Sequence, residues 1–144
     1  MKRKINIFLT VLLSTLFMLC CLVSCKQTQG EAKAVVEQTT ETMVVIKVNE
    51  AEDGATLLSV MEALRSEEKL SFELASGMIS SINGKANPAD YSSCWMLYTS
   101  DTEMANTEWG TTEYNGNTLG SAILGADALT VIADAYYIWV YQTF

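Results

Sequence analysis

The sequence predicts an α+β fold, in which one main helix packs on a mixed sheet of five or six short strands. The first observation behind this prediction is a stretch whose apolar residues recur at helical spacing. The second is a series of short runs of β-branched and aromatic residues, separated by turn-forming residues. These runs fall within residues 42–144, a stretch of ordinary size for one domain with a single hydrophobic core.

The first two elements are predicted to be a strand and a helix. The segment "MVVIKV" (43–48) is rich in β-branched residues, which favour strands. The polar segment 49–55 predicts a loop, and Thr56 follows it as the cap of a helix that continues to about Ser66. Four apolar residues of this helix share one face, which we expect to be buried beneath the sheet: Leu57, Val60, Met61 and Leu64.

Further strands are predicted at 70–75, 78–82, 94–99, 128–133 and 136–141. The dipeptide Asn83-Gly84 suits a tight turn after the second of them, because both positions tolerate positive φ. Residues 100–117 are mostly polar and predict a long loop, with a hairpin turn at Asn115-Gly116.

The N-terminal residues have the layout of a secretory signal. Three basic residues at 2–4 precede an uncharged, mostly apolar run at 5–24. The segment "LVSC" at the end of this run resembles the lipobox of bacterial lipoproteins. The resemblance implies that residues 1–24 are removed as a signal peptide and that Cys25 is acylated and begins the mature chain. A single transmembrane anchor is the alternative, since about twenty apolar residues are long enough to span a bilayer.

Removal of the signal peptide leaves a strongly acidic chain. The full sequence has 9 basic and 17 acidic residues, and three of the basic ones lie at 2–4, so the mature chain keeps six and has a net charge of −11. Such a chain repels nucleic acids and anionic headgroups, so no nucleic-acid partner is expected and membrane contact rests on the acyl anchor. Residues 25–41 are predicted to form a lipidated flexible tether. The protein is therefore expected outside the cytoplasm, anchored to the cell membrane.

Four segments occur in the order and approximate spacing of one family: "DGATLLSVMEAL", "ISSING", "CWMLY" and "IADAYYIWVY". They resemble the C-terminal β-grasp domain of transcobalamin and intrinsic factor, and a group of uncharacterised bacterial extracytoplasmic domains related to it. The resemblance covers residues 43–144 and implies a ubiquitin-like β-grasp fold with a role in binding a soluble ligand. It makes a corrinoid one ligand to consider. Transcobalamin holds its corrinoid against a large helical domain, which has no counterpart in this sequence, so a complete corrinoid site is not expected.

No catalytic apparatus is predicted, and we expect the protein not to be an enzyme and to require no cofactor. The sequence contains no histidine, the most frequent general base and a common zinc ligand. Cys94, the one cysteine after Cys25, is predicted to be a small buried hydrophobic residue. The acidic loops leave a divalent metal open as a ligand, with Asp101 and Glu103 as its carboxylate ligands, although solvated acidic loops are the default.

The aromatic residues of the predicted strands suggest a binding surface. Alternate side chains of a strand lie on the same face, and a sheet with one helix leaves its other face partly open. Aromatic rings on an open face offer flat apolar area with a polar edge, which suits a small soluble ligand. The predicted site residues are Trp95, Tyr98, Trp109, Tyr137, Trp139 and Tyr141.

Two alternatives to this binding surface stay open from the sequence. The same aromatic side chains would equally serve to complete the core or to pack against the loop at 100–117. The protein would then be a structural domain of the cell envelope, or one that contacts another envelope protein or a glycan.

Overall fold

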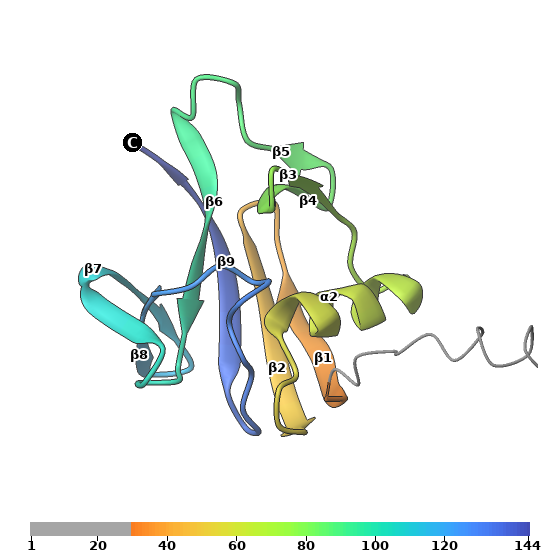
Figure 1. The fold of residues 1–144 in the computed structure, drawn as a ribbon. Helices are drawn as coiled ribbons and strands as arrows, with labels where there is room; N and C mark the ends of the chain where they lie inside the picture. The colour runs from red at the N-terminus through yellow and green to blue at the C-terminus, as the bar shows by residue number, and fades with distance from the viewer. Residues whose placement is uncertain (1–29) are drawn as a thin grey trace, which may run out of the picture.

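The structure is a computed structural model that describes residues 30–144. Within this range the chain forms nine strands and one helix, arranged as a six-stranded antiparallel sheet and a smaller three-stranded sheet (Figure 1). None of the helical structure in this range is both long and apolar enough to cross a membrane. The predicted signal peptide, residues 1–24, and the predicted lipidation site, Cys25, lie outside the described residues.

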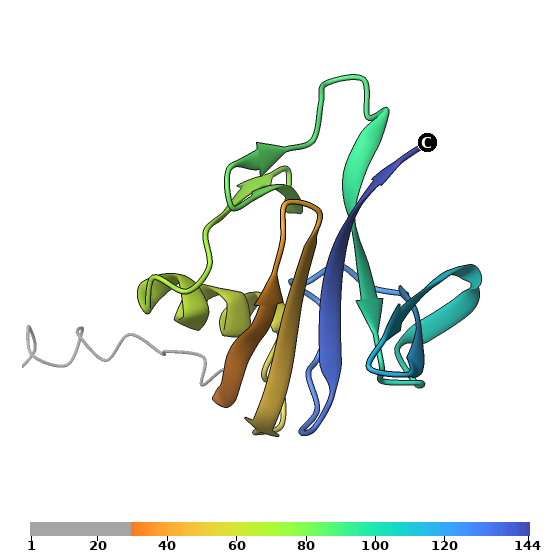
Figure 2. The same ribbon diagram turned by 180° about the vertical axis from the view of Figure 1, so that it is seen from behind.

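The large sheet has the strand order β1-β2-β9-β6-β8-β7, and each pair of neighbours is antiparallel. Seen from behind in Figure 2, the β7–β8 hairpin twists away from the plane of the other strands. In chain order the strands of this sheet are β1 (Ala32–Thr39), β2 (Met43–Ala51), β6 (Ser93–Thr99), β7 (Ala105–Tyr114), β8 (Asn117–Ala122) and β9 (Tyr136–Thr143).

The small sheet is a hairpin with a short third strand. It consists of β3 (Phe72–Ala75), β4 (Met78–Ile82) and β5 (Lys85–Ala86), in that spatial order. The predicted turn between β4 and β5 is confirmed, since Asn83 and Gly84 have φ of 49° and 81°. This sheet lies near the end of the large sheet where β6 begins (Figure 1).

The predicted α+β class, with a mixed sheet, is wrong, because the described residues are mostly strand and every strand pair is antiparallel. The β-grasp architecture that the resemblance implied is corrected with it. Two segments account for much of the difference. Residues 32–39 of the predicted tether form β1, and residues 105–114 of the predicted loop form β7. Both are the edge strands of the large sheet, where few side chains are buried and the apolar alternation is weak.

A third segment was predicted as a strand and is not one. Residues 128–133 are irregular, with one isolated bridge between Thr130 and Thr56. The segment is apolar because Leu129 and Val131 are buried in the core, where backbone hydrogen bonds of 2.8 Å join Leu129 to Leu57 and Val131 to Ala55. Its apolar residues therefore cover the start of the helix without pairing as a strand.

The helix prediction is confirmed. Helix α2 (Leu57–Ser66) buries its four predicted residues, and it covers one face of the large sheet at the β1–β2 end (Figure 1). Thr56 caps its N-terminus: the Thr56 Oγ1 accepts from the Ser59 N–H at 3.2 Å, and the Ser59 Oγ accepts from the Thr56 N–H at 3.1 Å. Two otherwise unpaired helix-end donors are satisfied in this way.

Replacing Thr56 by alanine should therefore lower the free energy of unfolding by about 1 kcal/mol. Stability is lost because the substitution removes the Thr56 Oγ1, which is the acceptor of the Ser59 N–H. That N–H has no other partner in the first helical turn. Urea denaturation followed by circular dichroism measures it, with Thr102→Ala on the exposed surface as the control. Equal stability of the two variants would show that the capping box contributes nothing.

The two faces of the large sheet carry separate cores. The larger core lies on the helix side and includes Trp95, Tyr137 and Trp139. The opposite face was expected to be partly open, but Val45, Tyr98, Leu119 and Ile138 form a second buried cluster there. The β7–β8 hairpin covers this cluster, and the Tyr114 ring packs edge-on against Tyr136 at 5.3 Å between centroids. Neither face is left as a bare aromatic platform.

Candidate ligand-binding groove

The structure separates the six predicted aromatic site residues into three groups. Trp95, Tyr137, Trp139 and Tyr141 lie on the helix side, where Trp95 and Tyr141 make an edge-to-face contact with centroids 5.3 Å apart. Tyr98 lies in the core on the opposite face. Trp109 is on β7, and 65% of its surface is exposed. The expected open aromatic face is therefore not found, and most of these rings complete the core.

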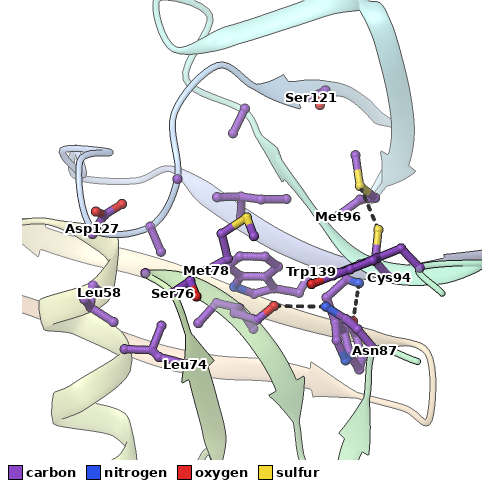
Figure 3. Close-up of a pocket in the computed structure, with 18 residues that line it drawn as sticks. Leu58, Leu74, Ser76, Met78, Asn87, Cys94, Met96, Ser121, Asp127 and Trp139 are labelled. Carbon is purple, nitrogen blue, oxygen red and sulfur yellow. Dashed lines mark hydrogen bonds between the residues drawn. The ribbon is translucent and has the colours of Figure 1, made fainter. Parts of the chain in front are cut away.

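A cavity of about 650 Å³ borders part of the helix-side group (Figure 3). Four parts of the chain form it: the β3–β4 hairpin with the segment after β5, the middle of β6 with Trp139, the end of β8 with the segment that follows it, and Leu58 at the start of α2. We call it the β4–β6 groove. Its lining residues are Leu58, Leu74, Ser76, Gly77, Met78, Ile79, Asn87, Tyr91, Cys94, Trp95, Met96, Leu97, Ser121, Ala122, Gly125, Ala126, Asp127 and Trp139.

The groove follows an open edge of β6. This strand pairs with β9 from Ser93 to Thr99, but it pairs with β8 only at Tyr98 and Thr99. Residues 93–97 therefore have a strand partner on one side only. The four consecutive residues 94–97 all line the groove, although successive side chains of a strand point to opposite faces. The cavity must therefore run along the edge of β6 and reach both faces of the sheet.

One side chain bridges the groove between the two sheets. The Asn87 Nδ2 donates to the backbone carbonyl of Ile79 in β4 at 3.1 Å, and the Asn87 Oδ1 accepts from the backbone N–H of Trp95 in β6 at 3.0 Å. Figure 3 shows both bonds as dashed lines. A third bond, from the Asn87 N–H to the Ser80 carbonyl at 2.8 Å, holds the residue in place. A single amide group thus joins the edge of β4 to the edge of β6.

The Trp139 ring lines the groove, and its buried indole N–H has no hydrogen-bond partner. Only 5% of Trp139 is exposed, and among the described residues its Nε1 is the one buried side-chain nitrogen or oxygen that is unpaired. Figure 3 places the ring at the centre of the lining side chains. By contrast, the Trp95 Nε1 donates to the Lys85 carbonyl at 2.8 Å, and the Tyr141 hydroxyl donates to the Ala86 carbonyl at 3.1 Å. An unpaired buried donor costs about 1–3 kcal/mol, so an acceptor that reached this N–H would be stabilising.

The mouth of the groove is apolar and exposed. Leu74, Met78 and Tyr91 are 43%, 62% and 62% exposed, although they are large hydrophobic or aromatic residues. Leu74 and Met78 flank the tip of the β3–β4 hairpin. Asp127 is the only acidic residue in the lining, and no basic residue lines the groove. A ligand with an apolar body and no negative charge fits these surroundings.

Cys94 is only half-buried, at the side of the groove, and its thiol lies 3.5 Å from the Met96 sulfur. It was predicted to be a small buried hydrophobic residue, and it instead contributes to the lining. The two side chains follow the same face of β6, because they are two residues apart in the strand.

The two predicted metal ligands differ in their surroundings. The buried Asp101 carboxylate accepts the backbone N–H of Glu103 at 3.0 Å, and its own N–H donates to the Thr99 hydroxyl at 3.0 Å. The Glu103 side chain is exposed. Across residues 30–144, no three His, Cys, Asp or Glu side chains come together in a way that would hold a metal ion. Asp101 has a local structural partner, which is enough to explain its burial.

Several groove residues were missed from the sequence. Leu74 and Met78 flank the dipeptide Ser76-Gly77 between two predicted strands, so their place beside a hairpin turn was readable. Asn87 carries no comparable signal, because its role depends on two strands that are distant in the chain.

No protein-family model matches the sequence, and no curated protein or solved structure gives a match either.

Proposed function

We propose that this protein is a membrane-anchored, extracytoplasmic binding module that captures a small soluble ligand in the β4–β6 groove and does not transform it. The observation that carries the proposal is a mostly apolar cavity of about 650 Å³ whose lining includes Trp139, the residue with the unpaired buried N–H. This volume lies within the range of about 300–1,000 Å³ that is usual for ligand sites. The anchoring part of the proposal rests on the lipobox-like segment that ends at Cys25.

The lining defines the chemistry of the ligand. An apolar body would replace water along Leu74, Met78 and Leu97, and one hydrogen-bond acceptor would pair with the Trp139 N–H. A carboxylate or phosphate is disfavoured, because the lining offers no Lys or Arg and the chain as a whole carries a net charge of −8. The favoured ligand is neutral or cationic and carries a carbonyl, ether or hydroxyl oxygen.

The side chains in the groove suit ligand binding without catalysis. Its ionisable side chains are Tyr91, Cys94 and Asp127, and none of them forms a hydrogen bond to another. A nucleophile normally needs a base within hydrogen-bond distance, and histidine is absent from the sequence. The resemblance of four sequence segments to transcobalamin-like extracytoplasmic domains also supports a role in ligand binding.

Tryptophan side-chain resonances provide a direct test. The sequence has three tryptophans, so a ¹⁵N-labelled full chain gives three indole N–H signals. Titration with a set of neutral, carbonyl-bearing aromatic fragments should shift the Trp139 signal downfield, because its N–H gains an acceptor. The signal of the exposed Trp109 should stay in place. Fragments that leave Trp139 unmoved throughout, or that move only Trp109, would refute the proposal.

A further inference from the structure

We propose that the ligand of the β4–β6 groove is an aromatic organic cation, whose apolar body lies in the groove and whose ammonium group pairs with the Asp127 carboxylate. This inference rests on the proposed function, because it assigns the chemical class of the ligand at the same site. Asp127 is the one acidic or basic side chain in the lining, and it is exposed. Among residues 30–144 its carboxylate has no ion pair and no hydrogen bond, so it is free to bind a cation.

The backbone holds the Asp127 carboxylate at the rim of the groove. Asp127 lies in a turn that is closed by a bond from the Leu129 N–H to the Gly125 carbonyl at 2.9 Å. The preceding residue, Ala126, accepts the Leu58 N–H at 2.8 Å, which joins this turn to the start of α2. A Cβ atom on Gly125 would lie 3.0 Å from the Asp127 Oδ1, so the carboxylate lies close to a glycine that itself lines the groove. The negative charge is therefore in place before a ligand binds.

The groove has a charged end and an apolar centre. Figure 3 places Asp127 at one end of the lining and Cys94 and Met96 at the other, with Met78 and Trp139 between them. Methionine sulfur makes favourable contacts with aromatic rings, and a tryptophan ring also packs well against a second ring. The lining thus suits a ligand whose body is aromatic and whose positive charge is at one end.

The charges on the rest of the surface favour the same ligand. Every basic side chain of residues 30–144 already contacts a carboxylate or an aromatic ring: Lys33 with Glu50, Lys47 with Glu37, Arg65 with Glu62, Lys69 with Glu67, and Lys85 over the Tyr141 ring. All 17 acidic residues lie in this range, and four of them belong to those ion pairs. The other carboxylates have no basic partner within this range, so the field of the domain attracts cations.

A series of small cations tests the inference. The probes are phenylalkylammonium ions with different numbers of methylene groups, each compared with the phenylalkanol and the phenylalkanoate of the same length. Nuclear magnetic resonance titration of the full chain gives the affinities. At low salt, the best ammonium ion should bind at least about threefold more tightly than its alcohol, as expected for an exposed ion pair, and the carboxylate should bind most weakly. High salt should reduce this preference, because it screens an exposed charge.

A matched pair of variants assigns the preference to one carboxylate. Asp127 and Asp134 are both exposed and both lie in turns, but only Asp127 lines the groove. Asp127→Asn should lower the ratio of ammonium to alcohol affinity to about one. Asp134→Asn removes the same charge from the chain and should keep the ratio of the unmodified protein. Asparagine also tolerates the φ of 61° at Asp134, so the control should fold normally.

The outcomes separate this inference from the proposed function. If no ammonium ion binds more tightly than its alcohol, the cation inference fails, and the small-ligand function stands as long as the neutral probes shift the Trp139 signal. If the two variants lower the ratio equally, or if neither lowers it, the preference comes from the net charge of the chain and Asp127 is not the anchor. If neither the charged nor the neutral probes bind, both proposals fail.

Discussion

Replacing Trp139 by alanine is expected to lower the free energy of unfolding by about 3–5 kcal/mol. The side chain is 5% exposed and belongs to the larger core, and its strand position is paired on both sides, with Val44 of β2 and Leu97 of β6. Removing the indole therefore leaves a cavity between two strands that are themselves fixed. Denaturation in guanidinium chloride, followed by circular dichroism, gives the value.

Trp139→Phe and Trp109→Ala are the controls for this experiment. Phenylalanine keeps an aromatic ring in the core and removes the unpaired N–H, so it should cost clearly less than alanine. Trp109 is 65% exposed, and its truncation should change stability by less than about 0.5 kcal/mol. A Trp139→Ala protein as stable as Trp109→Ala would mean that the indole is not part of the core.

Replacing Leu64 by alanine should cost about 2–5 kcal/mol. Leu64 is 2% exposed on the inner face of α2, where it packs in the same core as Val60 and Met61. The helix lies on the sheet and cannot easily move to fill the space, because its N-terminus is fixed by the backbone bonds of Leu57 to Leu129 and of Leu58 to Ala126, each 2.8 Å. The same denaturation experiment measures the loss.

Ser66→Ala, on the exposed side of the same helix, is the matched control and should change stability by less than about 0.5 kcal/mol. A Leu64→Ala cost as small as this would show that the buried face of the helix has been assigned wrongly.

The helix was predictable because its determinants are local. The Thr56 cap and four apolar residues at helical spacing lie within ten positions of one another. The edge strands β1 and β7 could not be predicted in the same way, because an edge strand packs one face at most and these two show little apolar alternation. In β1, Lys33 pairs with Glu50 in water, and in β7 the tryptophan is exposed. Tertiary pairing, more than side-chain pattern, makes these segments strands.

The aromatic residues of the candidate site also show that a local sequence pattern does not reveal tertiary packing. The alternation of Tyr137, Trp139 and Tyr141 correctly placed them on one face, but it did not tell whether that face was open. The expectation that Trp139 lies on an open face would make its loss harmless to the fold, which its burial contradicts. The groove depends on where the ladder between β6 and β8 ends, and no residue of β6 marks that point in the sequence.

The place of β1 in the large sheet limits how far the domain can stand from its proposed anchor. The predicted tether ran to residue 41, but the sheet already begins at Ala32. An extended chain spans at most about 3.6 Å per residue, so the seven steps from Cys25 to Ala32 reach no further than about 25 Å. With Cys25 as the proposed lipid attachment point, the first strand stays within one domain diameter of the bilayer. Such a protein samples what diffuses along the membrane surface, and a partner embedded in the same membrane meets it by two-dimensional search.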